Sequence, residues 1–489
     1  MSKTTRVISR LVSERRRHHW WGVCFIAACT GLAGCQPGPL SAESDALRPA
    51  ALDQPDSVYG RLATTWKDVR SGESTADDGD LLPEHPELAH YQQYAALHNA
   101  GLKASFADLQ AALEQLPQVA ALPDPRLTYG LYLQEVETRV GPMQHQVSIA
   151  QTFPWFGKLH EKESAAARAA RAAYYRLEQQ RLSLRHQVAA AYFELYRLDR
   201  EIKLTEETVE LLLQVEQIAT ARYRVDSATH PDLIRIQMQL SKMDERVRSL
   251  RDRQQPAVAA FNALLNREVD AVVEWPSRID GGSDLDDVSH LTQRAMVSNP
   301  GLRALTELIE RERINMKLAR LDGKPDFTFG LMYTVVDEAE NPSMPESGKD
   351  PVMASVSVNL PIWREKYDAG ARQAVARRLA LSHRRAEQER HLTTSIEQTH
   401  YRWREACRTI ELYRNVLTPR ATESMEAILV AFQNGESGFL DVLDAEQTLL
   451  EFQLALDKAE VERAVAASEI DMLVGTGLLQ DDQRKDTGQ

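Results

Sequence analysis

The chain has 489 residues, a formal net charge of -13 and four cysteines. The acidic balance argues against nucleic acid as a partner, because a phosphate backbone is recognised by basic surfaces. The length would allow two or three ordinary domains, but the pattern shows few short elements and several very long helical stretches. After residue 35 no apolar run approaches the length of a transmembrane helix, so a chain that crosses a membrane would have to use strands.

Residues 1–34 are predicted to be a signal peptide. A basic region is followed by a short apolar run, Trp20 to Ala33, which is too short to anchor the chain across a bilayer. The run ends in Leu32-Ala33-Gly34-Cys35, which has the form of a bacterial lipobox. An ordinary signal peptide with a chance cysteine is the alternative, but small residues directly precede Cys35 and a polar, proline-rich stretch follows it. By this resemblance Cys35 is lipidated and residues 35–84 form a lipidated linker.

The remaining cysteines and the histidines give no sign of a metal site or an active site. Two cysteines leave with the signal peptide and Cys35 is assigned to the lipobox, so only Cys407 remains, as a packing residue on a predicted helix. His85, His90 and His98 are spaced at roughly one-turn multiples, but scattered helical histidines are usually surface residues. No Ser/His/Asp set, phosphate loop or zinc pattern is present. We therefore expect no enzyme, no cofactor and no bound metal.

The strongest pattern in the mature chain is a duplication with a period of about 200 residues. A long-period duplication indicates a fold with internal pseudo-symmetry. We predict a first repeat over 85–280, a second over 281–478, and a disordered tail over 479–489. The matching segments are Asn99-Ala100-Gly101-Leu102 with Asn299-Pro300-Gly301-Leu302, Leu127-Thr128-Tyr129-Gly130 with Phe327-Thr328-Phe329-Gly330, Phe153-Pro154-Trp155 with Leu360-Pro361-Ile362-Trp363, and Arg222 to Asp226 with Ala431 to Gly435.

Each repeat contains two stretches in which apolar residues alternate with small or polar ones, as in a strand. The predicted strands cover about 126–136, 144–153, 325–336 and 351–362. Each is about ten residues long, which is the length that a tilted strand needs to cross the hydrocarbon layer. Two hairpins of a soluble sheet are the alternative. In lipid, however, four strands cannot close a barrel and open edges are forbidden, so a membrane interpretation requires oligomerisation.

Very long helices are predicted between the hairpins. Residues 158–224 contain no proline and carry an apolar stripe with helical spacing. At 1.5 Å per residue this helix would be roughly 100 Å long, which suggests a coiled coil rather than a globular helix. The other predicted helices are the return helix 231–266, a second long pair over 363–433 and 439–475, and two shorter helices, 86–116 and 288–320, that precede the hairpins.

The lipobox, the duplicated helix–hairpin–helix units and the hairpin ends at 151–158 and 359–363 together resemble the TolC-like outer membrane efflux proteins. The most family-specific piece is the turn Asn434-Gly435-Glu436-Ser437 with the segment 439–445 that follows it, and the resemblance covers roughly residues 85–478. It implies a mainly α fold with a small membrane β part. In a homotrimer, four strands per subunit would make a twelve-stranded β-barrel, continued by a long α-helical coiled-coil barrel.

The resemblance also implies a function, a location and partners. It implies a passive duct in the cell outer membrane, lipid-anchored and spanning as a trimeric barrel, with a periplasmic tunnel. This duct would export small molecules or metal cations received from a periplasmic adaptor (membrane fusion protein) and an inner membrane pump of the resistance-nodulation-division type. The start of the first hairpin at 123–125 and its end at 153–158 look more like the heavy-metal cation branch than the drug branch.

Two other functions are alternatives to the efflux duct. The exit duct of a type I protein secretion system has the same architecture, so the sequence leaves the exported substrate open. A periplasmic coiled-coil adaptor is a third interpretation, from a different class. An adaptor would have one helical hairpin flanked by lipoyl-like β segments, and the twofold repeat with two strand pairs counts against it.

Four residues are candidates for a periplasmic aperture. Asp441 and Asp444 are spaced i, i+3 and share one helix face; the family resemblance places them at the constriction, where a trimer makes rings of like charge that favour cations. In the first repeat Asp232 matches Asp441 and Arg235 matches Asp444, so Arg235 could pair with either aspartate of the second repeat. The alternatives are two aspartates favoured by a helix dipole and a plain solvated arginine.

The turns at the far ends of the long helices are candidate adaptor-docking tips. The first tip is Val225-Asp226-Ser227 and the second is Asn434-Gly435-Glu436-Ser437. The first tip carries Asp226 where the second carries Gly435, which puts the equivalence of the two docking sites in doubt.

Overall fold

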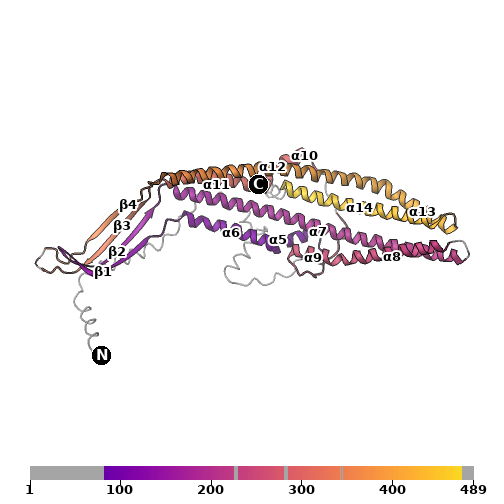
Figure 1. The fold of residues 1–489 in the computed structure, drawn as a ribbon, viewed down its shortest axis with the longest axis horizontal. Coiled ribbons are helices and arrows are strands. Elements are labelled where there is room, and N and C mark those ends of the chain that lie inside the picture. The colour runs from indigo at the N-terminus through magenta and orange to yellow at the C-terminus, as the bar shows by residue number, and fades with distance from the viewer. Residues whose placement is uncertain (1–81, 225–228, 280–284, 342, 344, 476–489) are drawn as a thin grey trace, which may run out of the picture. The chain divides into compact units, whose positions relative to one another are not determined.

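The computed structural model describes residues 82–224, 229–279, 285–341, 343 and 345–475 (Figure 1). The predicted signal peptide, Cys35 and the predicted tail lie outside these residues. The chain divides into two compact units. The sheet unit contains Glu114–Ser164 and Leu318–Tyr367, and the helical unit contains Ala165–Lys317 with the described parts of the flanking segments.

Four antiparallel strands form one sheet in the order β1-β2-β3-β4. The hairpins of the two repeats are joined through β2 and β3, with Gln151 opposite Phe329. β1 runs two residues further than the alternation predicted, and β4 ends four residues before the predicted 362. The strands are β1 (Arg126–Thr138), β2 (Gly141–Phe153), β3 (Phe327–Val336) and β4 (Val352–Val358).

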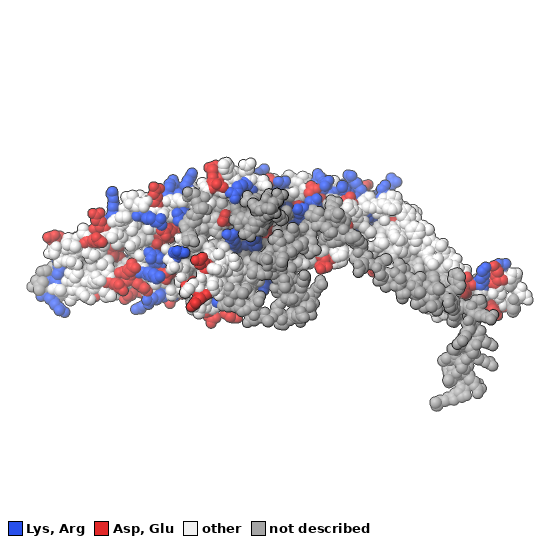
Figure 2. Space-filling view, turned by 180° about the vertical axis from the view of Figure 1, so that it is seen from behind, with Lys and Arg blue, Asp and Glu red and all other residues white. Residues whose placement is uncertain are grey.

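One face of the sheet is apolar and exposed. Leu133 of β1 is 92% exposed and Val356 of β4 is 63% exposed, and the surface of the strands that is visible in Figure 2 is mostly free of charged side chains. The other face carries small and polar residues. A Cβ at Gly330 would lie 2.6 Å from the Oγ of its cross-strand partner Ser355, so a side chain at this position would require the Ser355 hydroxyl to turn away.

Long helices make up most of the remaining described chain. None of the described helices has a stretch long and apolar enough to cross a membrane. The helices are α5 (Leu88–His98), α6 (Ala100–Ala120), α7 (Lys158–Arg224), α8 (His230–Asp252), α9 (Gln254–Leu265), α10 (Val288–Ser298), α11 (Pro300–Asp322), α12 (Arg364–Leu412), α13 (Thr418–Asn434) and α14 (Phe439–Val474).

The single helices predicted over 86–116 and 288–320 are wrong, because each is two helices. The chain breaks between α5 and α6 at Asn99 and between α10 and α11 at Asn299, where ψ takes extended values of 124° and 122°. The duplicated Asn-x-Gly-Leu motif therefore marks a helix break in both repeats.

The two asparagines explain the break. The side-chain oxygen of Asn99 accepts the N–H of Leu102 at 3.0 Å, as an N-cap residue does. Its amide nitrogen donates to the carbonyl of Leu264, in the last turn of α9, at 2.9 Å. Asn299 repeats both bonds, at 3.1 Å within α11 and at 2.9 Å to the end of α14. Each asparagine starts one helix and binds the end of another.

Two further helices that the sequence analysis treated as continuous are interrupted next to prolines. The predicted helix 231–266 is broken between α8 and α9, three residues before Pro256. The predicted helix 363–433 contains a π-helical turn, Tyr413–Leu417, just before Pro419. Proline has no N–H and leaves the carbonyl four residues earlier without its helical partner, and a wider turn accommodates this.

One apolar cluster joins the ends of four helices in the helical unit, and we call it the tip cluster. Because α7, α8, α13 and α14 all contribute to it, the two repeats share a single core at this end. Its buried members are Leu212, Val215 and Ala219 of α7, Ile236, Leu240 and Met243 of α8, Met425 and Phe432 of α13, and Phe439, Val442 and Ala445 of α14.

Candidate aperture and docking tips

The second tip is a tight turn that ends α13 and leads into α14. Gly435 has φ +84°, and its N–H donates to the carbonyl of Phe432 at 3.1 Å. The N–H of Glu436 donates to the carbonyl of Ala431 at 2.9 Å. This is the glycine-terminated helix end in which the last carbonyls are satisfied by the turn. The first-tip residues Val225, Asp226 and Ser227 lie outside the described residues.

Arg222 connects the second tip to the last turn of α7, a contact that the sequence analysis missed. Its Nη1 donates to the carbonyl of Phe432 at 2.9 Å. Its guanidinium also lies over the Phe432 ring, 5.1 Å from the centroid, and this ring is only 3% exposed. A cation at the C-terminal end of a helix interacts favourably with the helix dipole, so Arg222 stabilises the end of α13.

Asp441 caps the helix on which it lies. Its Oδ2 accepts the backbone N–H of Gly438 at 3.0 Å and the hydroxyl of Ser437 at 2.8 Å. These two hydrogen bonds hold the pKa of Asp441 below its usual value, and the bond from Ser437 has the larger effect. This carboxylate therefore has a local structural role at the start of α14, whatever role it has in a pore.

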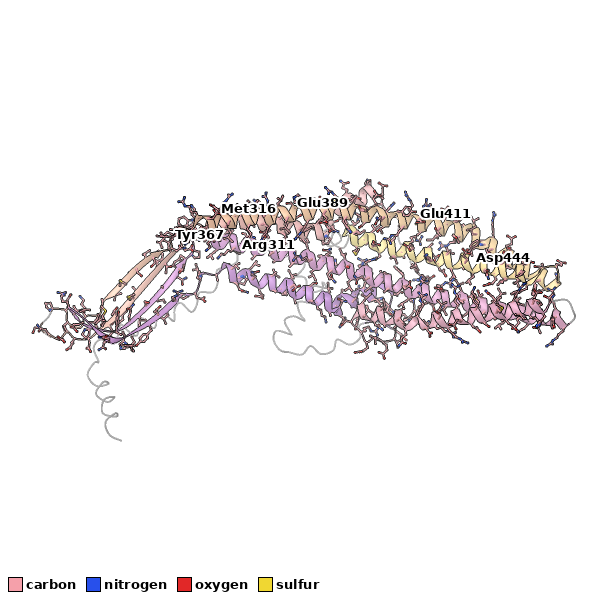
Figure 3. All side chains as sticks on the ribbon, in the orientation of Figure 1. Arg311, Met316, Tyr367, Glu389, Glu411 and Asp444 are labelled. Carbon is pink, nitrogen blue, oxygen red and sulfur yellow. The ribbon has the colours of Figure 1, made fainter. Side chains whose placement is uncertain are left out.

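Asp444 lies one turn further along α14 and is exposed (Figure 3). Among the described residues, no side chain forms an ion pair or hydrogen bond with its carboxylate. Asp444 thus differs from Asp441 in that its charge is not used within the subunit.

The first repeat pairs its own charges at the matching position. Arg235 Nη1 lies 3.8 Å from Asp232 Oδ1, one turn earlier on α8. The hydroxyl of Thr229 donates to the other oxygen of Asp232 at 2.5 Å. Arg235 is 52% exposed, and such a surface pair contributes about 0–1 kcal/mol, so it leaves Arg235 available to a second carboxylate.

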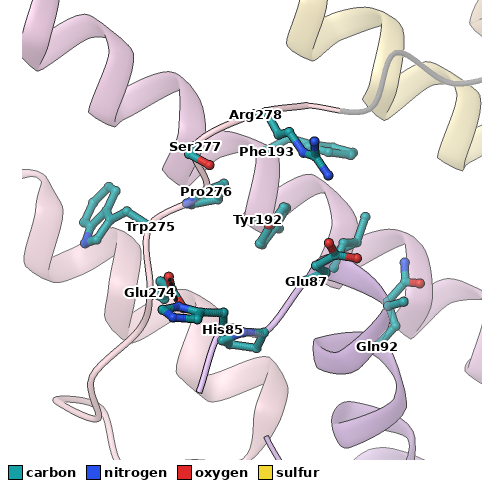
Figure 4. Close-up of a pocket in the computed structure, with 13 residues that line it drawn as sticks. His85, Glu87, Gln92, Tyr192, Phe193, Glu274, Trp275, Pro276, Ser277 and Arg278 are labelled. Carbon is teal, nitrogen blue, oxygen red and sulfur yellow. Dashed lines mark hydrogen bonds and ion pairs between the residues drawn. The ribbon is translucent and has the colours of Figure 1, made fainter. Parts of the chain in front are cut away.

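A hollow of about 550 Å³ lies between the start of α5, α7 and the segment after α9 (Figure 4). His85 Nδ1 lies 2.9 Å from Glu274 Oε1 at its rim. His85 precedes α5 rather than lying on it, which corrects the expected helical row of histidines. His90 accepts the N–H of Glu87 at 3.0 Å, and His98 stacks on Tyr94. No group of three His, Cys, Asp or Glu side chains among the described residues is arranged to hold a metal.

The Pro-Asp motif at the start of β3 has a structural role in the sheet unit. Asp326 Oδ1 accepts from Lys158 Nζ at 2.7 Å and from the backbone N–H of Trp155 at 2.8 Å. The Lys158 side chain is only 5% exposed, so this ion pair is shielded. It ties the end of the first hairpin to the start of the second.

Known proteins share both the sequence pattern and this fold. The profile of the family "Outer membrane efflux protein" matches residues 92–267 and 291–476, one segment for each repeat. The cobalt-zinc-cadmium resistance protein CzcC of Cupriavidus metallidurans is 21% identical over 391 residues, which cover 78% of this chain and 88% of CzcC.

Solved structures give the same result for the fold. The outer membrane protein VceC of Vibrio cholerae superposes with a TM-score of 0.66 at 18% identity, over 79% of this chain and 96% of VceC. The outer membrane channel MtrE of Neisseria gonorrhoeae gives a TM-score of 0.65 at 16% identity, over 80% of this chain and 89% of MtrE. The mainly helical fold with a small antiparallel sheet is that of TolC-like channels. With both repeats matched by the family profile, the chain belongs to the outer membrane efflux protein family, a family of efflux channels.

Proposed function

We propose that this chain is the outer membrane duct of a tripartite efflux system, working as a homotrimer. The observation that carries the proposal is the four-stranded sheet with two open edges, β1 and β4. Unpaired strand edges are not tolerated in lipid, while three such sheets placed edge to edge close into a twelve-stranded barrel. The exposed apolar face of the strands would then contact lipid, and the long helices would continue the barrel as a periplasmic tunnel.

The two repeats, 85–280 and 281–478, would alternate around this tunnel. Asp441 and Asp444 would form acidic rings at its periplasmic end, and Arg235 of the first repeat would pair with one of these aspartates when the aperture is closed. The uncommitted carboxylate of Asp444 and the exposed guanidinium of Arg235 support this arrangement. The two tips would dock a periplasmic adaptor, which connects the duct to an inner membrane pump of the resistance-nodulation-division type.

For the cargo we propose divalent metal cations. The support is the similarity to CzcC, whose name states resistance to cobalt, zinc and cadmium, together with acidic rings that would favour cations. We further propose that Cys35, exposed by removal of the signal peptide 1–34, anchors the linker 35–84 to the outer membrane through its acyl chains.

The oligomeric state tests this proposal directly. The mature protein, purified in mild detergent, should run as a trimer by light scattering and lose its strand signal when the trimer is dissociated. A monomer that keeps its full strand content in detergent would contradict the shared barrel. Deletion of the gene in its own host should raise cellular zinc, cobalt or cadmium, and an unchanged metal content would remove the proposed cargo while leaving the duct intact.

A further inference from the structure

Glu446 is a buried carboxyl group that the proposed duct does not use. It lies on α14, between the aperture aspartates and the middle of the helix, and is 2% exposed. In the part of the chain that the structure describes, neither of its oxygens makes a hydrogen bond with good geometry, and the side chain of Thr208 comes closest to one. A buried carboxylate without partners is strongly unfavourable, and such a group takes up a proton instead.

The polar side chains that influence Glu446 come from two other helices. Thr208 of α7 faces it, as do Lys242 and Arg246 of α8, while α13 contributes the apolar Met425 to the adjoining tip cluster. Arg246 donates to Glu201 at 3.2 Å, and Lys242 is exposed to solvent. Neither cation forms an ion pair with Glu446 among the described residues. Burial, the largest influence, raises the pKa of this carboxyl, and Thr208, Arg246 and Lys242 offset only part of that rise.

The first repeat has no buried carboxyl at this position. With Asp232 aligned on Asp441, the residue that matches Glu446 is Gln237, a neutral amide of the same length that is exposed and donates to Glu216 at 3.2 Å. An amide at position 446 would not change charge with pH. The carboxyl gives the second repeat a sensitivity to pH that the first repeat lacks at this point.

We propose that Glu446 is a proton-linked switch of the aperture: its carboxyl is protonated while α14 packs against α7 and α8, and it releases the proton to solvent when α14 moves away. This inference rests on the proposed duct, in which α14 carries the aperture residues. Packing is then strongest below the ordinary glutamate pKa of about 4.3 and weakens as the pH rises through the raised pKa. Asp441 does not produce this dependence, because its pKa is lowered and it stays ionised throughout.

Planar-bilayer recordings of the reconstituted protein between about pH 5 and pH 8 test the switch. In the wild type the ratio of open to closed channels should rise with pH, by roughly tenfold per subunit for each unit by which packing raises the pKa. Glu446→Gln should give a ratio that is independent of pH and equal to that of the wild type in acid. Glu451→Gln, an exposed position on the same helix, should behave as the wild type. An E446Q channel that keeps the pH dependence of the wild type would overturn the proposal.

A second measurement separates this inference from the proposed function. Thermal unfolding of the detergent-solubilised protein, followed by helix circular dichroism, does not depend on a conducting channel. E446Q should have a higher melting temperature than the wild type at about pH 8 and the same melting temperature at about pH 5. If the wild type forms no channel but this difference in melting temperature is found, the proposed duct is refuted, while the protonation of Glu446 in the packed state is supported. Equal melting temperatures at both pH values would refute the proton-linked role of Glu446.

Discussion

Asp441 and Asp444 lie one turn apart on α14, yet their carboxylates are in different situations. Asp441 accepts two hydrogen bonds at the start of the helix, whereas Asp444 is exposed and has no partner among the described residues of the subunit. Substituting Asp441 therefore changes both the helix cap and the proposed pore charge, while substituting Asp444 changes mainly the charge.

We expect Asp444→Asn to reduce the cation preference of the channel without loss of stability. The ring of three Asp444 carboxylates in the proposed trimer would lose its charge. Block by multivalent cations should therefore weaken, and single-channel conductance should rise in planar bilayers. The double variant Asp441→Ala/Asp444→Ala should show larger changes in the same direction, together with a loss of about 1 kcal/mol of stability from the missing hydrogen bonds at the start of α14. Unchanged selectivity and conductance in both variants would place the constriction elsewhere.

Arg235→Ala should change the leakage of the closed channel rather than its cation preference. It would leave the acidic rings intact, so cation preference should remain, but a closed aperture would lose its candidate counter-charge and leak more often. The intrasubunit pair with Asp232 at 3.8 Å is weak and exposed, so its loss should leave the melting temperature nearly unchanged. If the variant leaks no more than the wild type in bilayer recordings, Arg235 is a solvated surface residue that takes no part in closing the aperture.

At the scale of elements, periodicity predicted the types and much of the extent of the strands and long helices, because alternation and helical stripes are local properties. Periodicity did not predict where the helices are interrupted. Asn99 and Asn299 lie in sequences that read as helical, and their capping role depends on carbonyls of α9 and α14 far along the chain. Pro419 was a visible signal of the π-helical turn. No local pattern predicts the contact of Arg222 with Phe432, which are 210 residues apart.

The duplicated asparagines allow a test of how the helix breaks are held. Asn99→Asp keeps the capping oxygen for Leu102 and loses the amide that donates to Leu264, whereas Asn99→Ala loses both. We expect Asn99→Ala to cost about 1–2 kcal/mol, with part of that loss restored in Asn99→Asp. Thermal or urea unfolding in detergent measures the difference. Equal loss in both variants would assign the whole effect to the bond with α9.

At the scale of the whole molecule, the proposed attachment to the membrane is twofold, by barrel and by acyl chain. Cys35→Ser should abolish labelling by radioactive palmitate and leave signal processing blocked or rerouted. Because the barrel would still hold the protein in the membrane, trimers that do form should remain in the outer membrane fraction. Normal palmitate incorporation in this variant would refute the lipobox assignment.

The open edges of β1 and β4 also bear on how such a channel comes into existence. A lone subunit can neither complete its sheet nor enter lipid at low cost, and its two long edges can pair with the wrong strand of any neighbour. Formation of the barrel by encounter of three chains would therefore depend steeply on how many subunits are present at once. A cell that makes this protein slowly would gain few finished channels per chain, and one that makes it too fast would risk edge-to-edge aggregates.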